Sequence, residues 1–126
     1  MSDKSPSPHT VLHLRFKLRV SPAGFLAHSR EAATKIASVE GLIWKIWLLQ
    51  EEESEMGGIY LFANRKTAEA YLNGLIVQAV RSNPAVVSTK SHLWGVESSL
   101  SALTRGPMHD ICVQYSEPDA LVAGGL

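Results

Sequence analysis

The first clear pattern along the chain is the alternation of apolar and polar side chains in residues 10–20, TVLHLRFKLRV. One face of this stretch carries Leu12, Leu14, Phe16 and Leu18. The other face carries Val11, His13, Arg15 and Lys17. A period of two residues is typical of a strand. We therefore predict a strand with one apolar face and one largely polar face.

Two stretches show the helical period instead. Ser21-Pro22 resembles an N-cap followed by proline in the first helical position, and apolar residues at helical spacing continue to about Val39, before Gly41. The second helix is predicted to begin at Asn64 and to end before Asn83-Pro84, because proline disfavours a helical residue before it.

Three further strands are predicted at residues 42–50, 57–63 and 86–96, with an acidic hairpin loop at 51–55 and a short helix at 98–103. The order is therefore βαββαβ. Right-handed crossovers place both helices on one face of a four-stranded antiparallel sheet. The predicted fold class is α+β, with a ferredoxin-like fold.

Trp44 and Trp47 lie three residues apart on the second predicted strand. An odd spacing sends the two indoles to opposite faces of a sheet. The helices cover one face, and the other would be bare in a monomer. A bare face that carries tryptophan or several aliphatic side chains usually marks an interface, so we predict a homodimer whose two sheets face each other.

Composition excludes several classes of function. The 126 residues are 45% hydrophobic and carry no net charge, so a nucleic-acid partner, which usually binds a basic face, is not expected. A single cysteine, Cys112, excludes an intramolecular disulfide and a multi-cysteine zinc site, and fits a reducing compartment. No apolar stretch reaches the length of a membrane span, and we expect a cytoplasmic protein.

The chain is predicted to hold one domain. Residues 1–9 are interpreted as a disordered lead, residues 10–104 as the ferredoxin-like domain, and residues 105–126 as an extension that covers a cavity or the dimer interface. Within this extension, residues 111–115 are interpreted as a short strand or an arm.

A resemblance to a known family rests on three pieces of the sequence. These are GLIWKIW (41–47), GGIYLF (57–62) and AYL (70–72), and the first strand fits the same pattern. Together they resemble the YdhR monooxygenase family of the dimeric α/β-barrel superfamily, over roughly residues 10–104. The resemblance implies a dimer whose sheets pack into a barrel. It also implies kinship with cofactor-free oxygenases of aromatic polyketide pathways, so no cofactor is expected.

Three residues are predicted to be catalytic. His13 lies on the polar face of the first strand, and His92 lies on the fourth strand, which neighbours the first in this fold. Either imidazole suits a general base near neutral pH. Tyr60 is predicted to donate a hydrogen bond to a substrate oxygen. The structural alternatives are interface histidines and a core tyrosine.

The residues predicted to bind substrate are either aromatic or basic. Aromatic side chains offer flat walls to an aromatic ligand, and cationic side chains attract an anion or stabilise a developing oxyanion. The alternatives are packing roles for the aromatic residues and solvated positions for the basic ones. The set comprises Trp44, Trp47, Phe62, Trp94, Arg15 and Lys45.

No phosphate loop, dinucleotide fingerprint, metal-ligand spacing or nucleophile elbow is present in the sequence. Acid–base catalysis, positioning and exclusion of water remain. The leading hypothesis is a cofactor-independent monooxygenase that acts on an aromatic or polyketide-like substrate. The alternatives are a cofactor-free cyclase, isomerase or dehydratase, and a ligand-binding dimer without catalysis.

Overall fold

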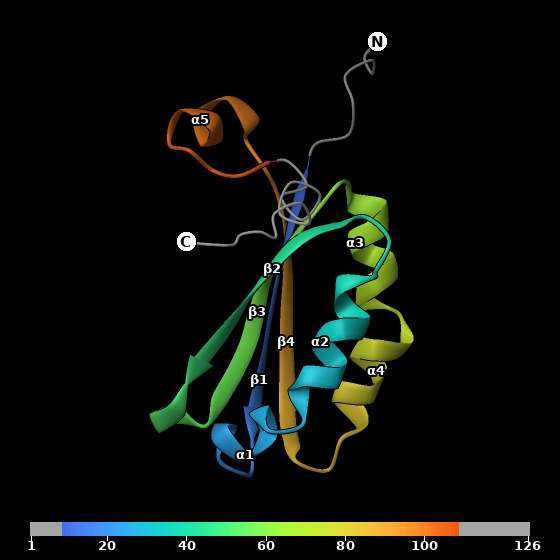
Figure 1. The fold of residues 1–126 in the computed structure, drawn as a ribbon, viewed down its shortest axis with the longest axis vertical. Coiled ribbons are helices and arrows are strands. Elements are labelled where there is room, and N and C mark those ends of the chain that lie inside the picture. The colour runs from blue at the N-terminus through green and yellow to red at the C-terminus, as the bar shows by residue number, and fades with distance from the viewer. Residues whose placement is uncertain (1–8, 109–126) are drawn as a thin grey trace, which may run out of the picture.

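A computed structural model of the chain describes residues 9–108 (Figure 1). The strands are β1 (Thr10–Leu18), β2 (Leu42–Gln50), β3 (Glu55–Phe62) and β4 (Val86–Gly95). The helices are α1 (Pro22–Leu26), α2 (Ser29–Ala37), α3 (Arg65–Leu72), α4 (Leu75–Ser82) and α5 (Ser98–Leu103), with a 3-10 helix, η1 (Glu51–Glu53), between β2 and β3. The predicted order of strands and helical regions is confirmed.

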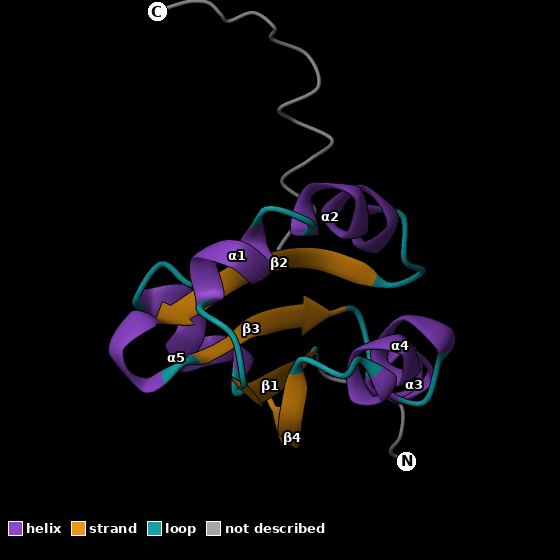
Figure 2. Ribbon diagram, turned by 90° about the horizontal axis from the view of Figure 1, so that it is seen from below, coloured by secondary structure: helices purple, strands orange, loops and turns teal. Residues whose placement is uncertain are grey.

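The four strands form one antiparallel sheet in the order β2-β3-β1-β4. Helices α2, α3 and α4 lie along one face of the twisted sheet (Figures 1 and 2). We call this the helix face, and the opposite side the open face. The predicted ferredoxin-like arrangement, with both crossovers on one side, is confirmed.

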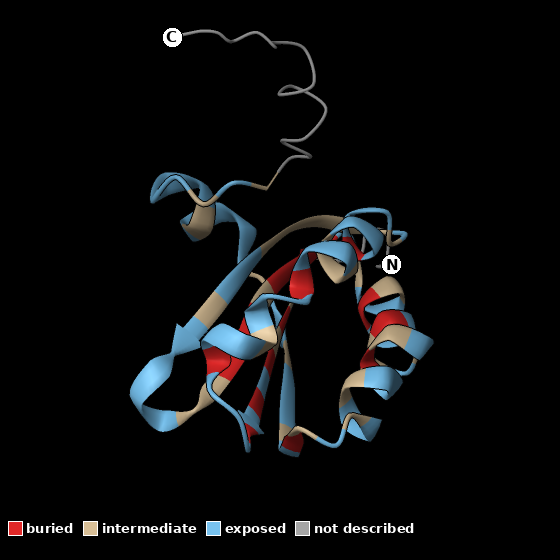
Figure 3. Ribbon diagram, turned by 60° about the horizontal axis from the view of Figure 1, so that its bottom comes forward, coloured by how far each residue is buried: buried red, intermediate tan, exposed pale blue. Residues whose placement is uncertain are grey.

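The core lies between the helix face and the helices. The alternation predicted for β1 is confirmed, because Leu12, Leu14, Phe16 and Leu18 are all buried. Buried residues gather on the central strands and on the helix sides that meet them (Figure 3). Burial of apolar side chains stabilises the fold by about 25 cal/mol for each Å² removed from water.

The prediction of one continuous helix in each crossover was wrong. The first crossover contains α1 and α2, and the second contains α3 and α4. The first breaks at Ala27 and His28, where the His28 backbone leaves the helical region at φ −107° and ψ 10°. The second breaks at Asn73 and Gly74, and Gly74 is extended at ψ −175° before α4. A continuous apolar stripe does not reveal such breaks, because both helices still turn apolar residues toward the sheet.

The ends of the strands also differ slightly from the predicted ends. β1 ends at Leu18, β3 begins at Glu55 and β4 ends at Gly95. The acidic loop contains η1 and then Ser54 in the left-handed region at φ 54°. This compact turn lets pairing begin at once between Gln50 and Glu55.

The predicted split of the two tryptophans is confirmed. Trp47 is paired with Gly58 and Trp44 with Leu61, which have opposite orientations in β3. The indole Nε1 of Trp44 donates a hydrogen bond to the carbonyl of Pro107 at 2.9 Å. The chain after α5 therefore returns to β2. Residues 111–115, predicted as a strand or an arm, lie outside the described residues.

Candidate active site

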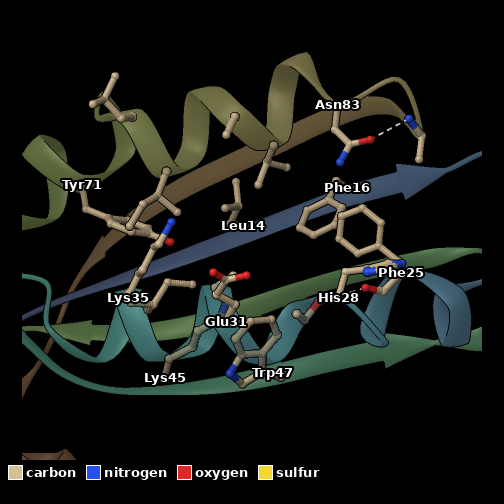
Figure 4. A pocket seen from close by; sticks show the side chains of 18 of the residues that line it. Leu14, Phe16, Phe25, His28, Glu31, Lys35, Lys45, Trp47, Tyr71 and Asn83 are labelled. Carbon is tan, nitrogen blue, oxygen red and sulfur yellow. Dashed lines mark hydrogen bonds between the residues drawn. The ribbon is translucent and has the colours of Figure 1, made fainter.

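A cavity of about 900 Å³ lies on the helix face, between the sheet and helices α2 and α4 (Figure 4). Its walls are mainly apolar and aromatic, and ligand pockets of 300–1,000 Å³ with such walls are common. The aromatic side chains come from three strands, β1, β2 and β3, and two helices, α1 and α3. These side chains are Phe16, Phe25, Trp47, Tyr60 and Tyr71.

The sheet contributes one basic side chain to the described lining of this cavity, Lys45 of β2. It is paired with Tyr60 of β3, and its Nζ lies 3.3 Å from the centroid of the Trp47 ring and 4.7 Å from that of Tyr60. Burial lowers the pKa of Lys45 to about 7, because removal from water disfavours the charged amine. Near neutral pH the side chain is therefore divided between ammonium and free amine.

Gly58 makes room for the Lys45 side chain. A Cβ at this position would lie 2.5 Å from Lys45 Cε and 3.2 Å from Tyr60 Cε1. Any larger residue would displace the lysine chain from its path across the strand. Gly58 of the GGIYLF segment therefore has a local steric role beside Lys45.

Tyr60 and Tyr71 form a hydrogen-bonded pair next to Lys45. Their hydroxyl oxygens lie 3.1 Å apart, and their rings are 5.1 Å apart. Burial raises the pKa of both phenols, so both remain protonated at neutral pH. Two O–H groups share one mutual hydrogen bond, which leaves one proton to donate to a ligand oxygen.

Polar side chains from the helices complete the cavity lining. Glu31 and Lys35 come from α2, and His28 precedes it (Figure 4). Asn83 accepts a hydrogen bond from the backbone N–H of Ala85 at 2.8 Å, which fixes its amide oxygen. The cavity therefore combines an apolar interior with polar groups able to orient a ligand.

The two histidines predicted as bases lie elsewhere. His13 and His92 are directly paired across β1 and β4, so their predicted proximity is confirmed. Both side chains point to the open face, because their neighbours Leu12 and Leu93 pack into the core on the other side. The Trp94 ring packs against the His92 ring at a tilt of 46°, with ring centroids 4.4 Å apart.

The other predicted site residues are divided between core and surface. Phe62 is fully buried against Tyr60 and Tyr71 and does not line the cavity. Arg15 lies on the open face, where it pairs with Glu55 at 3.4 Å. Of the predicted residues, the cavity brings together Lys45, Trp47 and Tyr60.

Sequence reasoning missed Tyr71, the partner of Tyr60. Its place in the apolar stripe of a helix was the available signal, since a tyrosine there must bring its hydroxyl to a partner. The catalytic and binding roles of all these residues stay predictions. Within residues 9–108, no three side chains of His, Cys, Asp or Glu lie close enough together to hold a metal ion.

Comparison with known families identifies the group to which the chain belongs. A family model described as "Putative mono-oxygenase ydhR" matches residues 11–107. The chain belongs to this YdhR family. A comparison with curated proteins gives no significant match. None of the helices in the described part of this YdhR-family chain is long and apolar enough to cross a bilayer.

Solved structures of other proteins share the fold of this YdhR-family chain. NE2512, a protein of unknown function from Nitrosomonas europaea, is 18% identical with a TM-score of 0.63, and the match covers 75% of this chain and 95% of that one. SnoaB, a cofactor-independent oxygenase from Streptomyces nogalater, is 15% identical with a TM-score of 0.58, over 75% and 98%. A dabb family protein from Mesorhizobium loti, described as ferredoxin-like, is 16% identical with a TM-score of 0.54, over 71% and 98%.

Proposed function

We propose that this chain is a cofactor-independent monooxygenase that binds an aromatic or polyketide-like substrate in the helix-face cavity. The observation that carries the proposal is the Lys45 amine between Trp47 and Tyr60 inside an apolar cavity. Membership of the YdhR family and the shared fold with a cofactor-independent oxygenase support this class of reaction.

The cavity supports an aromatic substrate by its size and its walls. About 900 Å³ accommodates several fused rings, and the rings of Trp47 and Phe16 offer apolar surfaces to them. The hydroxyl groups of Tyr60 and Tyr71 then offer one donor to a phenolic or carbonyl oxygen. A flat substrate with oxygen at its edge satisfies both features.

Lys45 is the proposed general base. Because burial lowers the pKa of Lys45 to about 7, a large fraction of the amine is free to take a proton at neutral pH. It removes a proton from the enolisable C–H or the hydroxyl of the substrate. The resulting ammonium and the tyrosine O–H then stabilise the developing oxyanion.

The anion reacts directly with molecular oxygen. For an anthrone, one CH₂ group becomes C=O, one oxygen atom enters the product and the other leaves as water. The four electrons come from the substrate carbon, so the reaction needs no separate reductant. The protein supplies binding, deprotonation and exclusion of water.

Oxygen uptake tests the proposal. Purified metal-free protein is mixed with a panel of anthrones and polyphenols, and oxygen consumption and substrate loss are followed together. We expect equal molar loss of oxygen and substrate, and at least about a tenfold decrease in kcat for Lys45→Met, since general bases contribute about 10²–10⁴-fold. Lys66→Met, a change on the exposed side of α3, is the matched control.

Two results would change the assignment. Substrate loss without oxygen consumption would indicate a cyclase, isomerase or dehydratase in the same cavity. Since His13 and His92 lie on the opposite face of the sheet, His13→Ala is expected to leave kcat unchanged. A loss of tenfold or more in folded His13→Ala would place the chemistry on the open face.

We also propose that the chain forms a homodimer through the open face. Ile46 and Trp94 project from this face and are 54% and 55% exposed. Burial of these side chains against a second copy supplies apolar contact area. Light scattering after size exclusion tests this: the native chain should have twice the mass of one chain, and Trp94→Glu should shift it toward the monomer. A monomeric native chain at micromolar concentration contradicts the proposal.

A further inference from the structure

The Lys45 amine has an unusual environment for a lysine. Its Nζ lies over the Trp47 ring at 3.3 Å and near the Tyr60 ring at 4.7 Å. Among residues 9–108, no hydrogen bond or ion pair is formed by this amine. Most lysine heads lie in water, whereas this one lies against two aromatic faces in a cavity.

We propose that Lys45 is a nucleophilic amine that captures aldehydes and ketones in the helix-face cavity as imines. The ligand class is an aromatic or polyketide-like molecule with a reactive carbonyl group. The inference rests on the same cavity as the proposed function. It requires no oxygen, so the two can fail separately.

Lys45 and a carbonyl compound form an imine and one molecule of water in two stages. The Nζ lone pair attacks the carbonyl carbon, and the C=O π electrons move to oxygen, which gains a proton to give a carbinolamine. The nitrogen then loses one proton, and the hydroxyl takes up a second proton and leaves as water. The nitrogen lone pair forms the C=N bond, and loss of the remaining N–H proton gives the neutral imine. Return of water reverses every step, so the protein is recovered unchanged.

The surroundings of Lys45 suit each step. The free amine is the nucleophile, and lowering of the lysine pKa by burial makes it available near neutral pH. The O–H that the Tyr60–Tyr71 pair has left to donate suits a hydrogen bond to the carbonyl oxygen, which polarises the carbonyl group toward attack. The mainly apolar walls favour binding of an apolar carbonyl compound next to the amine.

The position of the amine is fixed by its neighbours in the sheet. The Lys45 chain runs over Gly58, where a Cβ would come within 2.5 Å of its Cε. The other titratable groups lining the cavity are Glu31 and Lys35 of α2, His28 before α2, Tyr60 of β3 and Tyr71 of α3. Lys35 is thus a second amine of the same cavity and provides an internal comparison.

Reductive trapping on the native chain tests the proposal. The protein is incubated with benzaldehyde and cyanoborohydride at about pH 7, and labelling rates of individual lysines are measured by peptide mass spectrometry. Ordinary lysines with a pKa near 10.4 are less than about 0.1% unprotonated at this pH. We expect Lys45 to be labelled at least about tenfold faster than Lys66 and Lys35, because burial lowers the pKa of Lys45 and the cavity holds the aldehyde beside its amine.

Two further measurements separate capture in the cavity from general reactivity. Glyceraldehyde, which is polar, should lose most of the preference for Lys45 over Lys66. 2-Naphthol, which is aromatic but has no carbonyl group, should slow labelling of Lys45 and leave Lys66 unchanged. Equal labelling of Lys45 and Lys66, or no protection by 2-naphthol, would overturn the proposal. Fast labelling of Lys45 without oxygen uptake would support capture and reject the monooxygenase.

Discussion

Replacement of Lys45 by methionine tests whether burial of the lysine amine lowers the free energy of unfolding. Methionine has a similar length and no charge, so it keeps the apolar contacts of the lysine stem with Trp47 and Tyr60. A protonated amine taken out of water destabilises the folded state unless it is paired. We therefore expect Lys45→Met to be more stable than the native chain at neutral and acidic pH.

The expected size of the stability gain follows from the pKa of Lys45. Burial lowers the pKa of Lys45 from 10.5 to about 7. The difference is about 3.5, and each unit corresponds to about 1.36 kcal/mol, so the cost to the folded state is at most about 5 kcal/mol. The indole and phenol faces stabilise the ammonium by about 0.5–2 kcal/mol, and the side chain keeps some contact with water. We expect a net gain of about 2 kcal/mol at pH 6.

The sign of the pH dependence is opposite to that of a lysine in an ion pair. Between about pH 7 and pH 10.5 the unfolded state binds more protons at this position than the folded state. The stability of the native chain therefore rises with pH across this window. The cost is present in full below about pH 7 and disappears near pH 10.5, and the advantage of Lys45→Met should shrink accordingly.

Urea unfolding followed by tryptophan fluorescence measures this effect. The native chain, Lys45→Met and the control Lys66→Met are compared at about pH 6 and about pH 10, at one protein concentration. The difference between Lys45→Met and the native chain should fall by at least about 1 kcal/mol between the two pH values. An equal difference at both pH values, or a lower stability of Lys45→Met than of the native chain at pH 6, would contradict a desolvation cost at Lys45.

Three further substitutions test the local structure, each measured by urea unfolding. Gly41→Ala should cost about 2 kcal/mol or more, because Gly41 has φ +84° and a Cβ there would clash with the Thr67 side chain. Gly95→Ala, where no atom lies within 4 Å of the Cβ, is its control, and equal losses would contradict the steric explanation. Asn64→Ala should cost about 1 kcal/mol, since Asn64 is the N-cap of α3 and its Oδ1 accepts a hydrogen bond from the Thr67 N–H at 2.9 Å. An unchanged free energy of unfolding would contradict a stabilising role for this cap. Tyr71→Phe removes a buried hydroxyl hydrogen bond of 3.1 Å and should cost about 1 kcal/mol, and a gain in stability would show that the bond is strained.

Much of the fold could be predicted because its signals are local. The alternation in β1 predicted which side chains are buried, and the odd spacing of Trp44 and Trp47 predicted their opposite orientation. The helix breaks at His28 and Gly74 escaped prediction. Both helices of each pair present apolar residues to the same sheet, so the hydrophobic pattern continues across the break.

The candidate site depended on contacts between distant segments. The hydrophobic pattern alone predicted that β1 has a polar face with His13 and an apolar face with Leu14, and that a helix carries Tyr71. It did not determine which face holds a cavity, because a period of two separates the faces without distinguishing their surroundings. Only the tertiary structure placed the cavity between the sheet and α2 and α4.

The burial of Lys45 could not be predicted from the sequence for the same reason. On its strand it is one charged residue among apolar ones, and a lysine at a strand usually extends its head into water. The pairing of β2 with β3 places it beside Tyr60, and the helices cover it. The sequence determined the amine, and tertiary packing decided its burial, because desolvation depends on neighbours that come from distant parts of the chain.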